Sequence, residues 1–330
     1  MNALVRRIDL QNGEHEPQEL LRREWLLTNG LGGYASGTIS GSVTRRYHGL
    51  LIAALPAPLG RIIMLNHLAE DLRLADGRRV QFGGEEPSRT PETPDPLGMY
   101  ITEFRLECQS PIWQFEIEGI VIEKRVLLVH GQNTVHISYQ LLSGHDAVRL
   151  ELRPSFQFRP HENDVAEPWR DAYRLSIHGS RYEVHSEAAY PPLRLSLNGD
   201  AATFTHEGGH TREIAYAAEA ERGYRSRGVL WSPGIFAMTL RPKRDATFSA
   251  STESWDTLLT LTPPQAHKYE EQRRRRLITL ADPRARDGAA AELVLAADQF
   301  IISPSGRIED VARARAAGDE VRSVIAGYHW

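Results

Sequence analysis

Two neighbouring stretches near the start of the 330-residue chain hold the side chains best suited to bind a ligand. Residues 24–37 contain four glycines within eight positions, so the backbone there turns tightly or lets another group approach closely. Residues 44–51 bring together two guanidinium groups, a phenol and an imidazole, and no Asp or Glu occurs from Trp25 to Ala69. The candidate binding residues are therefore hydrogen-bond donors and aromatic rings: Asn29, Tyr34, Arg45, Arg46, Tyr47 and His48.

These side chains suit a polar, uncharged ligand such as a sugar. Sugar hydroxyls accept hydrogen bonds from guanidinium and amide groups, and the C–H faces of a sugar pack on aromatic rings. A structural interpretation is also open, in which the aromatic residues belong to the core and the two arginines pair with carboxylates elsewhere. Residue chemistry alone does not separate these two interpretations.

A dinucleotide-binding pattern in the first stretch does not meet its structural requirements. Residues 30–35 match G-x-G-x-x-A, but this pattern needs a helix next and an acidic residue about twenty positions later to hold the ribose. Residues 36–41, SGTISG, form a poor helix, and the stretch that follows has no acid. We therefore reject a dinucleotide site, and we predict no cofactor.

A zinc-protease pattern at residues 206–210, HEGGH, fails for a similar reason. Zinc binding by H-E-x-x-H requires both imidazoles on one face of a helix. Two adjacent glycines cost about 2 kcal/mol of helix propensity relative to alanine, and both flanks alternate as strands do. We predict a hairpin turn here and no metal site.

No catalytic centre is visible in the sequence. A glycosidase needs a paired acid and base or nucleophile, and the spacing of carboxylates such as Glu70, Asp71, Glu103 and Asp164 marks no pair. There is also no Gly-x-Ser-x-Gly elbow. We predict no catalytic residue in this chain.

Composition narrows the class of protein. A formal net charge of −4 gives no electrostatic basis for nucleic-acid binding. No apolar run is long enough to span a bilayer, and residues 1–13 lack the apolar segment of a signal peptide. Cys108 is the only cysteine, so neither a disulfide framework nor a thiolate metal site is expected. These features favour a cytoplasmic protein without nucleic-acid or membrane partners.

Short strand-like segments separated by turn residues predict a mainly β protein, with antiparallel sheets packed as a large sandwich. Asp76-Gly77 predicts a hairpin turn and residues 83–98 a proline-rich surface loop. The last β elements are expected to be a hairpin of residues 234–240 and 247–253 and a closing strand at 255–261. The other expected strands cover residues 50–55, 112–117, 120–129, 134–142, 148–153, 173–177, 182–185, 193–197, 202–205 and 212–216.

Helical patterns follow the β region. Residues 265–280 have acidic and basic side chains at i,i+4 spacing, so the basic run at 273–276 is interpreted as a solvated helix face. Residues 289–300, rich in Ala and Leu, predict a second helix that would suit burial among other helices. The apolar run at 324–330 looks like an interruption of a domain. We therefore expect residues 286–330 to be loosely ordered or packed back on the sheet.

The chain closely resembles the N-terminal domain of bacterial and archaeal glycogen debranching enzymes of the amylo-α-1,6-glucosidase type. The resemblance rests on residues 23–38, REWLLTNGLGGYASGT, and on residues 44–51, TRRYHGLL. It continues through WSPG at 231–234, LVLAADQFI at 293–301 and VIAGY at 324–328. It covers essentially the whole chain, although position 329 is His where the family pattern leads us to expect Pro.

The resemblance implies three parts: a β-supersandwich over residues 1–262, a linker helix over 263–285, and the first helix of an incomplete (α/α)6 toroid over 286–330. In this family the toroid carries the catalytic carboxylates, and the reaction is hydrolysis of α-1,6-linked glucose at a trimmed branch point. The resemblance therefore implies a non-catalytic part that shapes or binds the site of an α-glucan such as glycogen or limit dextrin, next to a downstream toroid.

Two other functions remain open at this stage. A free-standing sugar-modifying enzyme, such as a mutarotase-like epimerase, needs a histidine and a carboxylate that converge on one concave sheet face. His136, His178 or His185 with a strand glutamate could supply that pair. The third possibility is an interaction module that docks a separate catalytic chain.

Overall fold

The computed structural model describes residues 4–10, 17–84, 98–144, 146–166, 172–306 and 308–328. The strands are β1 (Val5–Asp9), β2 (Glu24–Thr28), β3 (Tyr34–Thr38), β4 (Gly49–Leu55), β5 (Gly60–Leu65), β6 (His67–Arg73), β7 (Arg79–Gly83), β8 (Ile101–Glu107), β9 (Ser110–Ile117), β10 (Ile120–Leu128), β11 (Thr134–Ser143), β12 (Val148–Ser155), β13 (Arg159–Pro160), β14 (Arg174–His178), β15 (Arg181–His185), β16 (Leu193–Asn198), β17 (Asp200–Ala215), β18 (Arg227–Leu240), β19 (Ala246–Ser251), β20 (Ile301–Ile302) and β21 (Ser323–Val324). The helices are α1 (Pro17–Arg22), α2 (Ala217–Glu221), α3 (Trp255–Thr260), α4 (Pro263–Leu280), α5 (Gly288–Gln299) and α6 (Ile308–Ala316), with a 3₁₀ turn at Pro283–Ala285.

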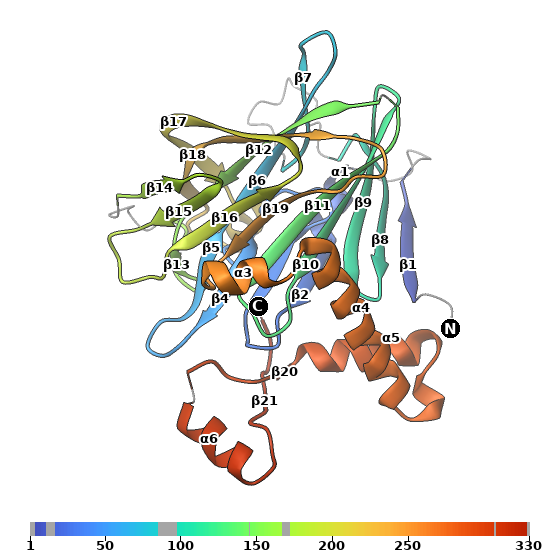
Figure 1. Ribbon diagram of the computed structural model, residues 1–330, viewed down its shortest axis with the longest axis vertical. Helices are drawn as coiled ribbons and strands as arrows, with labels where there is room; N and C mark the ends of the chain where they lie inside the picture. Colours follow the sequence, from blue (N-terminus) through green and yellow to red (C-terminus); the bar gives the residue numbers. More distant parts are fainter. Residues whose placement is uncertain are drawn as a thin grey trace.

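Three antiparallel sheets form the sandwich (Figure 1). In the described part of the chain, a nine-stranded sheet has the order β1-β8-β9-β10-β11-β19-β16-β15-β14. Two five-stranded sheets have the orders β17-β18-β12-β6-β7 and β13-β5-β4-β3-β2, and the chain passes from one to the other between β5 and β6. The predicted mainly β, antiparallel sandwich is confirmed, and helices α3 to α6 follow its last strand, β19.

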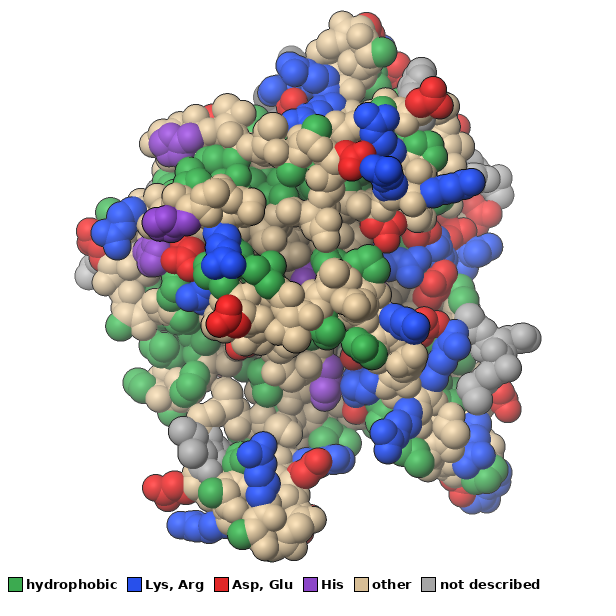
Figure 2. Space-filling view, viewed as in Figure 1, with side chains coloured by type: hydrophobic (Ala, Val, Ile, Leu, Met, Phe, Trp, Pro, Cys, Tyr) green, Lys and Arg blue, Asp and Glu red, His purple; other side chains and the backbone are tan. Residues whose placement is uncertain are grey.

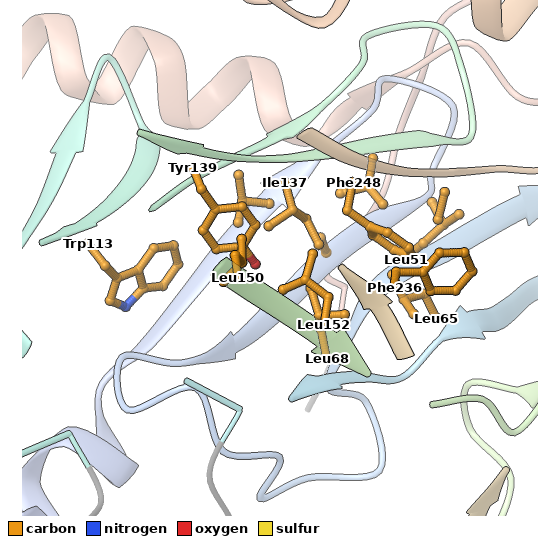
Figure 3. Close-up of a cluster of buried hydrophobic side chains, with 14 of the residues drawn as sticks. Leu51, Leu65, Leu68, Trp113, Ile137, Tyr139, Leu150, Leu152, Phe236 and Phe248 are labelled. Atoms are coloured by element: carbon orange, nitrogen blue, oxygen red, sulfur yellow. The ribbon is translucent and has the colours of Figure 1, made fainter. Parts of the chain in front are cut away.

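An apolar core lies between the sheets. Successive residues of a strand point to opposite faces, so the apolar residue at every second position of each strand points into this space. Figure 3 shows Ile137 and Phe248 of the nine-stranded sheet facing Leu152 and Phe236 of one five-stranded sheet, with Leu51 of the other beside them. All five are almost completely buried. Since the inward positions of all three sheets contribute to this cluster, the sandwich folds around a shared core.

A charged group also lies inside this core. The fully buried carboxylate of Glu70 on β6 accepts a hydrogen bond from Tyr139 on β11 and pairs with Lys124 on β10 at 2.7 Å. Burial and the neighbouring carboxylate raise the pKa of the Tyr139 phenol well above its usual value. Gly83 is paired with Glu70, and a Cβ at this glycine would lie 1.7 Å from the carboxylate. The ion pair therefore connects two sheets and excludes a side chain at position 83.

Several expected β elements differ from the structure. Residues 255–260 form helix α3 because the Ser254 hydroxyl caps it by accepting a hydrogen bond from the Thr257 amide at 3.2 Å. The expected hairpin of residues 234–240 and 247–253 is also wrong, since β18 pairs with β12 and β17 whereas β19 pairs with β11 and β16. Alternating apolar residues predicted these strands without showing that the chain changes sheets between them.

The HEGGH stretch is a bulge rather than the predicted hairpin turn. Residues 202–205 and 212–215 belong to one strand, β17, whose pairing with β18 shifts register between His206 and His210. Gly208 and Gly209 adopt φ values of 70° and 86°, which lets the strand accommodate the extra residues. Most of the predicted loop at 83–98, and position 329, lie outside the described residues.

The predicted helices at 265–280 and 289–300 are present as α4 and α5. Ile278 of α4 packs with Ala291 and Leu295 of α5 against Cys108 at the start of the β8–β9 turn. Helix α5 therefore packs on the sandwich and α4, and Leu293 on its other side is 69% exposed. The chain then forms α6 and returns to the strands at its C-terminal end (Figure 1). Within the described residues, no helix combines the length and apolarity needed to cross a membrane.

Candidate functional site

The glycine-rich loop between β2 and β3 is shaped by the side chain of Asn29, which is fully buried. Its Oδ1 accepts hydrogen bonds from the Leu31 and Gly33 amides at 3.0 and 2.9 Å. Its Nδ2 donates to the Gln132 carbonyl and to Asn133 Oδ1, both at 3.0 Å. An amide has two donor hydrogens and one acceptor oxygen with two lone pairs, so contacts within the protein use all the hydrogen-bonding capacity of Asn29.

The glycines of this loop are required by close contacts with protein groups. Gly30 has a φ of 72°, and a Cβ at this position would lie 2.3 Å from the His130 ring. A Cβ at Gly33 would lie 2.8 Å from the Ile52 carbonyl oxygen. The sequence indicated that another group approaches the glycine loop closely. In the structure, these groups are the turn at 130–133 and strand β4.

Asn133 is a site residue that the sequence analysis did not identify. Its side chain pairs with Ala54 on β4 as a neighbouring strand would, accepting from the Ala54 amide at 2.8 Å and donating to the Ala54 carbonyl at 3.0 Å. The Gly30 carbonyl accepts from the Ser303 amide at 2.8 Å. The glycine loop thus joins the nine-stranded sheet, strand β4 and the C-terminal segment. We call residues 29–33, 130–133 and 303 the glycine junction.

His48 holds the loop between β3 and β4 in place and is 1% exposed. Its Nδ1 accepts a hydrogen bond from the Thr44 amide at 3.1 Å, so the ring proton lies on Nε2, which faces Glu24 Oε1 at 3.3 Å. Arg45 Nε donates to the same oxygen at 2.5 Å. Burial would raise the pKa of Glu24, but hydrogen bonds from His48 and Arg45 hold it at about 2.

Arg46 is paired with Glu219, which the fold buries completely. Both carboxylate oxygens are used, one by the Arg46 amide at 3.0 Å and the other by its Nε at 2.8 Å. The Arg46 carbonyl in turn accepts from Arg159 at 2.5 Å. The guanidinium lies over the exposed ring of Tyr224, 4.7 Å from its centroid.

Tyr34 and Tyr47 both lie near His161. The Tyr34 hydroxyl donates to the Tyr47 carbonyl at 3.0 Å, and the ring centroids of the two tyrosines lie 6.1 and 5.9 Å from that of His161. Tyr34 is fully buried, which raises the pKa of its phenol. Tyr47 is only partly buried.

The outer face of the sheet β2–β5 is apolar and is covered by the end of the chain. Tyr34, Ile52 and Ile63 form a cluster with Tyr328, and Leu26 and Ile325 pack against it. The Tyr34 and Tyr328 rings meet edge to face with centroids 5.5 Å apart. Because the inner face of the same strands belongs to the main core, this sheet is buried on both faces here. That explains the continuous apolar run of β4.

The structure thus divides the six candidate residues among three sites. Arg45 and His48 meet at Glu24, and Arg46 pairs with Glu219 beside the two tyrosines, while Asn29 lies in the glycine junction. Both arginines pair with carboxylates, as the structural interpretation requires. Tyr47, Arg45 and Arg46 keep part of their side chains exposed, and the Tyr47 carbonyl is bonded to Tyr34 of the face that Tyr328 covers.

Of the three histidines considered for sugar-modifying chemistry, His185 has a carboxylate beside it, since its Nε2 lies 3.4 Å from Glu183 Oε2 on the same strand. The other oxygen of Glu183 accepts hydrogen bonds from Arg194 and Trp255. His136 is buried on β11 with its Nδ1 2.7 Å from the Ser249 hydroxyl, and burial lowers its pKa to about 4. His178 and His185 lie on β14 and β15, separated from β11 by β19 and β16. In the described residues, no group of three or more His, Cys, Asp or Glu side chains comes together as a metal site.

Comparison with known proteins finds a matching family and similar solved structures. A family described as "Glycogen debranching enzyme N terminal" matches residues 23–247. A search of curated proteins found no match. Among solved structures, a bacterial glucoamylase complexed with acarbose is similar at 9% identity and a TM-score of 0.28, over 83% of this chain and 34% of the glucoamylase. The chain thus spans about a third of the length of that enzyme.

Proposed function

Because the chain belongs to the glycogen debranching enzyme N-terminal family, we propose that it is the non-catalytic sandwich of a debranching-type glycoside hydrolase. The outer face of β2–β5 is then the surface on which a helical catalytic domain packs. The observation that carries this proposal is the cluster of Tyr34, Ile52 and Ile63 under Tyr328. Apolar positions on the outside of a sheet need a cover, and the chain supplies one immediately after its helices.

The contacts at this face fix the covering segment in position. Arg61 NH1 on β5 lies 3.5 and 3.4 Å from the Gly327 and Tyr328 carbonyl oxygens, and its guanidinium stacks on the Tyr328 ring. The Tyr328 hydroxyl donates to the Gln299 carbonyl at the end of α5 at 2.5 Å. The segment is thus tied to the sheet and to a helix. We infer that residues 1–262 form the sandwich, 263–285 a linker helix, and 286–330 the start of the helical domain.

At the edge of this face, Tyr47 is our candidate for contact with an α-glucan such as glycogen or limit dextrin. Its ring is partly exposed, and the hydrogen bond from Tyr34 to its carbonyl fixes its backbone. An exposed aromatic ring packs on the C–H face of a sugar, and the neighbouring Arg45 and Arg46 can donate to hydroxyls. Hydrolysis of α-1,6 branch points would take place in the helical domain, in the cytoplasm.

Two measurements test this proposal. The chain alone should release no glucose from a branched limit dextrin, because no acid/base pair is identifiable. Glucose release that a single carboxylate substitution abolishes would contradict the proposed non-catalytic role. In affinity electrophoresis through glycogen, Tyr47→Ala should reduce the retardation of the chain, while Tyr269→Ala, which removes a 53% exposed ring on α4, should not. Equal retardation of both variants and the parent chain would remove Tyr47 from the glucan site.

The alternative of a docking module for a separate catalytic chain uses the same face. It is favoured over sugar-modifying chemistry because an apolar face is present, whereas Glu183, the carboxylate beside His185, is held by Arg194 and Trp255. Co-expression with a separately encoded helical domain decides whether this face packs against a domain of the same chain or docks a separate chain. Stable co-purification of the two separate chains would favour the docking module.

A further inference from the structure

Helix α4 lies over a part of the nine-stranded sheet whose outer face is polar. Across β11 and β19, three pairs of buried polar side chains meet at hydrogen-bond distance. These pairs are Thr134 with Ser251 at 2.7 Å, His136 with Ser249 at 2.7 Å, and Ser138 with Thr247 at 2.9 Å. A polar sheet face normally contacts solvent, so the burial of these pairs requires another explanation. Ser138 lies at the end of this row that faces α4.

The charges around this face are mostly paired with one another. Arg105 contacts Glu103 and Glu107 at 2.8 Å and Glu123 at 2.5 Å, and Arg125 also reaches Glu123. Figure 2 shows acidic and basic side chains interspersed on the side of the molecule where α4 lies. This mutual pairing leaves no strong preference for an anion or a cation.

A cleft of about 390 Å³ separates α4 from the sheet. The sheet side contributes Ser138, Gln140 and Asp245, and α4 contributes residues spaced along one face of the helix, including His267, Lys268 and Glu271. Volumes of about 300–1,000 Å³ are typical of small-molecule sites. Arg274 fixes the helix above the cleft, since its NH1 donates to the Cys108 carbonyl and to the Ser110 hydroxyl at 2.7 Å.

We propose that this cleft binds a small neutral polyhydroxy molecule, a mono- or disaccharide. Gln140 Nε2 donates to Asp245 Oδ1 at 3.1 Å, which leaves the amide carbonyl and the second carboxylate oxygen as acceptors for hydroxyl groups. The exposed Lys268 supplies donors from the opposite wall. Closely mixed donors and acceptors without a dominant charge match the hydroxyls of a sugar. This inference is independent of the proposed function.

Two further features define the site. Burial lowers the pKa of His267 to about 3, so this ring is neutral and adds no charge near physiological pH. The ring of Tyr139 belongs to the main core and its hydroxyl donates to Glu70, so it offers no stacking surface to the cleft. Without such a surface, affinity in the millimolar range is expected, with recognition by hydrogen bonds.

Ligand-observed NMR titration of the 330-residue chain with glucose and with maltose tests the site. Saturable binding of at least one of these sugars is expected, about tenfold weaker in Lys268→Met and lost in Glu271→Trp, which fills the mouth of the cleft. Arg276→Met, an exposed change on α4 outside the cleft, should bind as the parent chain does. Absence of saturation, equal affinity in all variants, or preferential binding of the zwitterion glycine would each overturn the proposal.

Discussion

The outer faces of two sheets are both covered by segments that follow the sandwich, but they are covered in opposite ways. On β2–β5 the contact is apolar, with Tyr328 and Ile325 on Tyr34, Ile52 and Ile63. On the nine-stranded sheet the outer face carries pairs of polar side chains and ion pairs, and a cleft separates this face from α4. Apolar contact resists changes of pH and salt, whereas buried ionisable groups depend on both.

The apolar and the polar face suit different purposes. An apolar face has its full favourable contribution only when it is closely packed, which suits a permanent boundary between domains. A polar face can stay hydrated or exchange water for a ligand, because its groups form hydrogen bonds in either state. We therefore expect the two faces to respond differently to the same perturbation.

The largest effect is expected from Tyr34→Ala on the apolar face. Truncation of a fully buried aromatic side chain costs about 4 kcal/mol of unfolding free energy, through lost burial and the cavity left behind. Urea unfolding followed by tryptophan fluorescence measures this loss. A decrease below about 1 kcal/mol would mean that Tyr328 does not pack on this face in solution.

The polar face should be the first to weaken in acid. The pKa of His136 is lowered by burial from 6.5 to about 4, so the unfolded chain binds more protons than the folded chain between these values. The fold therefore keeps its full stability above about pH 6.5. As pH falls from there through about 4, the free energy of unfolding decreases by about 3 kcal/mol in total. Burial also lowers the pKa of His267, which lies near Arg125, Arg274 and Glu270, to about 3. This histidine therefore adds to the loss of stability in acid.

Unfolding free energies at pH 7 and pH 4.5 check this dependence. The parent chain should lose more stability between the two values than His136→Asn, which keeps a partner for Ser249 but has no titrating group. Hydrogen exchange should show α4 opening before β2 and β3. Parallel pH curves for the two proteins, or earlier exchange at β2 and β3, would contradict the comparison.

The sequence predicts features that depend on neighbouring residues, and it does not predict features that depend on contacts between distant segments. Alternating residues correctly predicted β10 and β11, because each strand has one face in the core. The same alternation failed at 255–260, where the Ser254 cap favours a helix. It also could not show that β18 and β19 join different sheets, because strand pairing is decided by distant segments.

The candidate site shows the same limit. Residue types left two interpretations of the arginines at 45 and 46 open, because the carboxylate that Arg46 pairs with, Glu219, lies 173 positions away in sequence. Asn133 was missed because its contact with Asn29 spans 104 positions, and an asparagine in a turn gives no local signal of such a role. Sequence patterns predict what a residue can do, while the partner comes only with the fold.

A smaller loss is expected from Arg274→Met on the polar face. This change removes the donor to the Cys108 carbonyl and the Ser110 hydroxyl, while Glu270 keeps Arg273 as a partner. We expect a decrease of about 2 kcal/mol in unfolding free energy, smaller in 1 M salt because the ion pair with Glu270 is screened. Arg276→Met is the matched control and should change stability by less than about 0.5 kcal/mol.

The smallest effect separates packing from hydrogen bonding on the apolar face. Tyr34→Phe keeps the ring against Tyr328 but removes the hydrogen bond to the Tyr47 carbonyl. One hydrogen bond contributes about 1 kcal/mol net, so this variant should keep most of the stability that Tyr34→Ala loses. The Tyr47 loop should exchange its amides faster while β3 stays protected. If Tyr34→Phe is as unstable as Tyr34→Ala, the hydroxyl contact and not the apolar cover holds this face, and the contrast between the two faces fails.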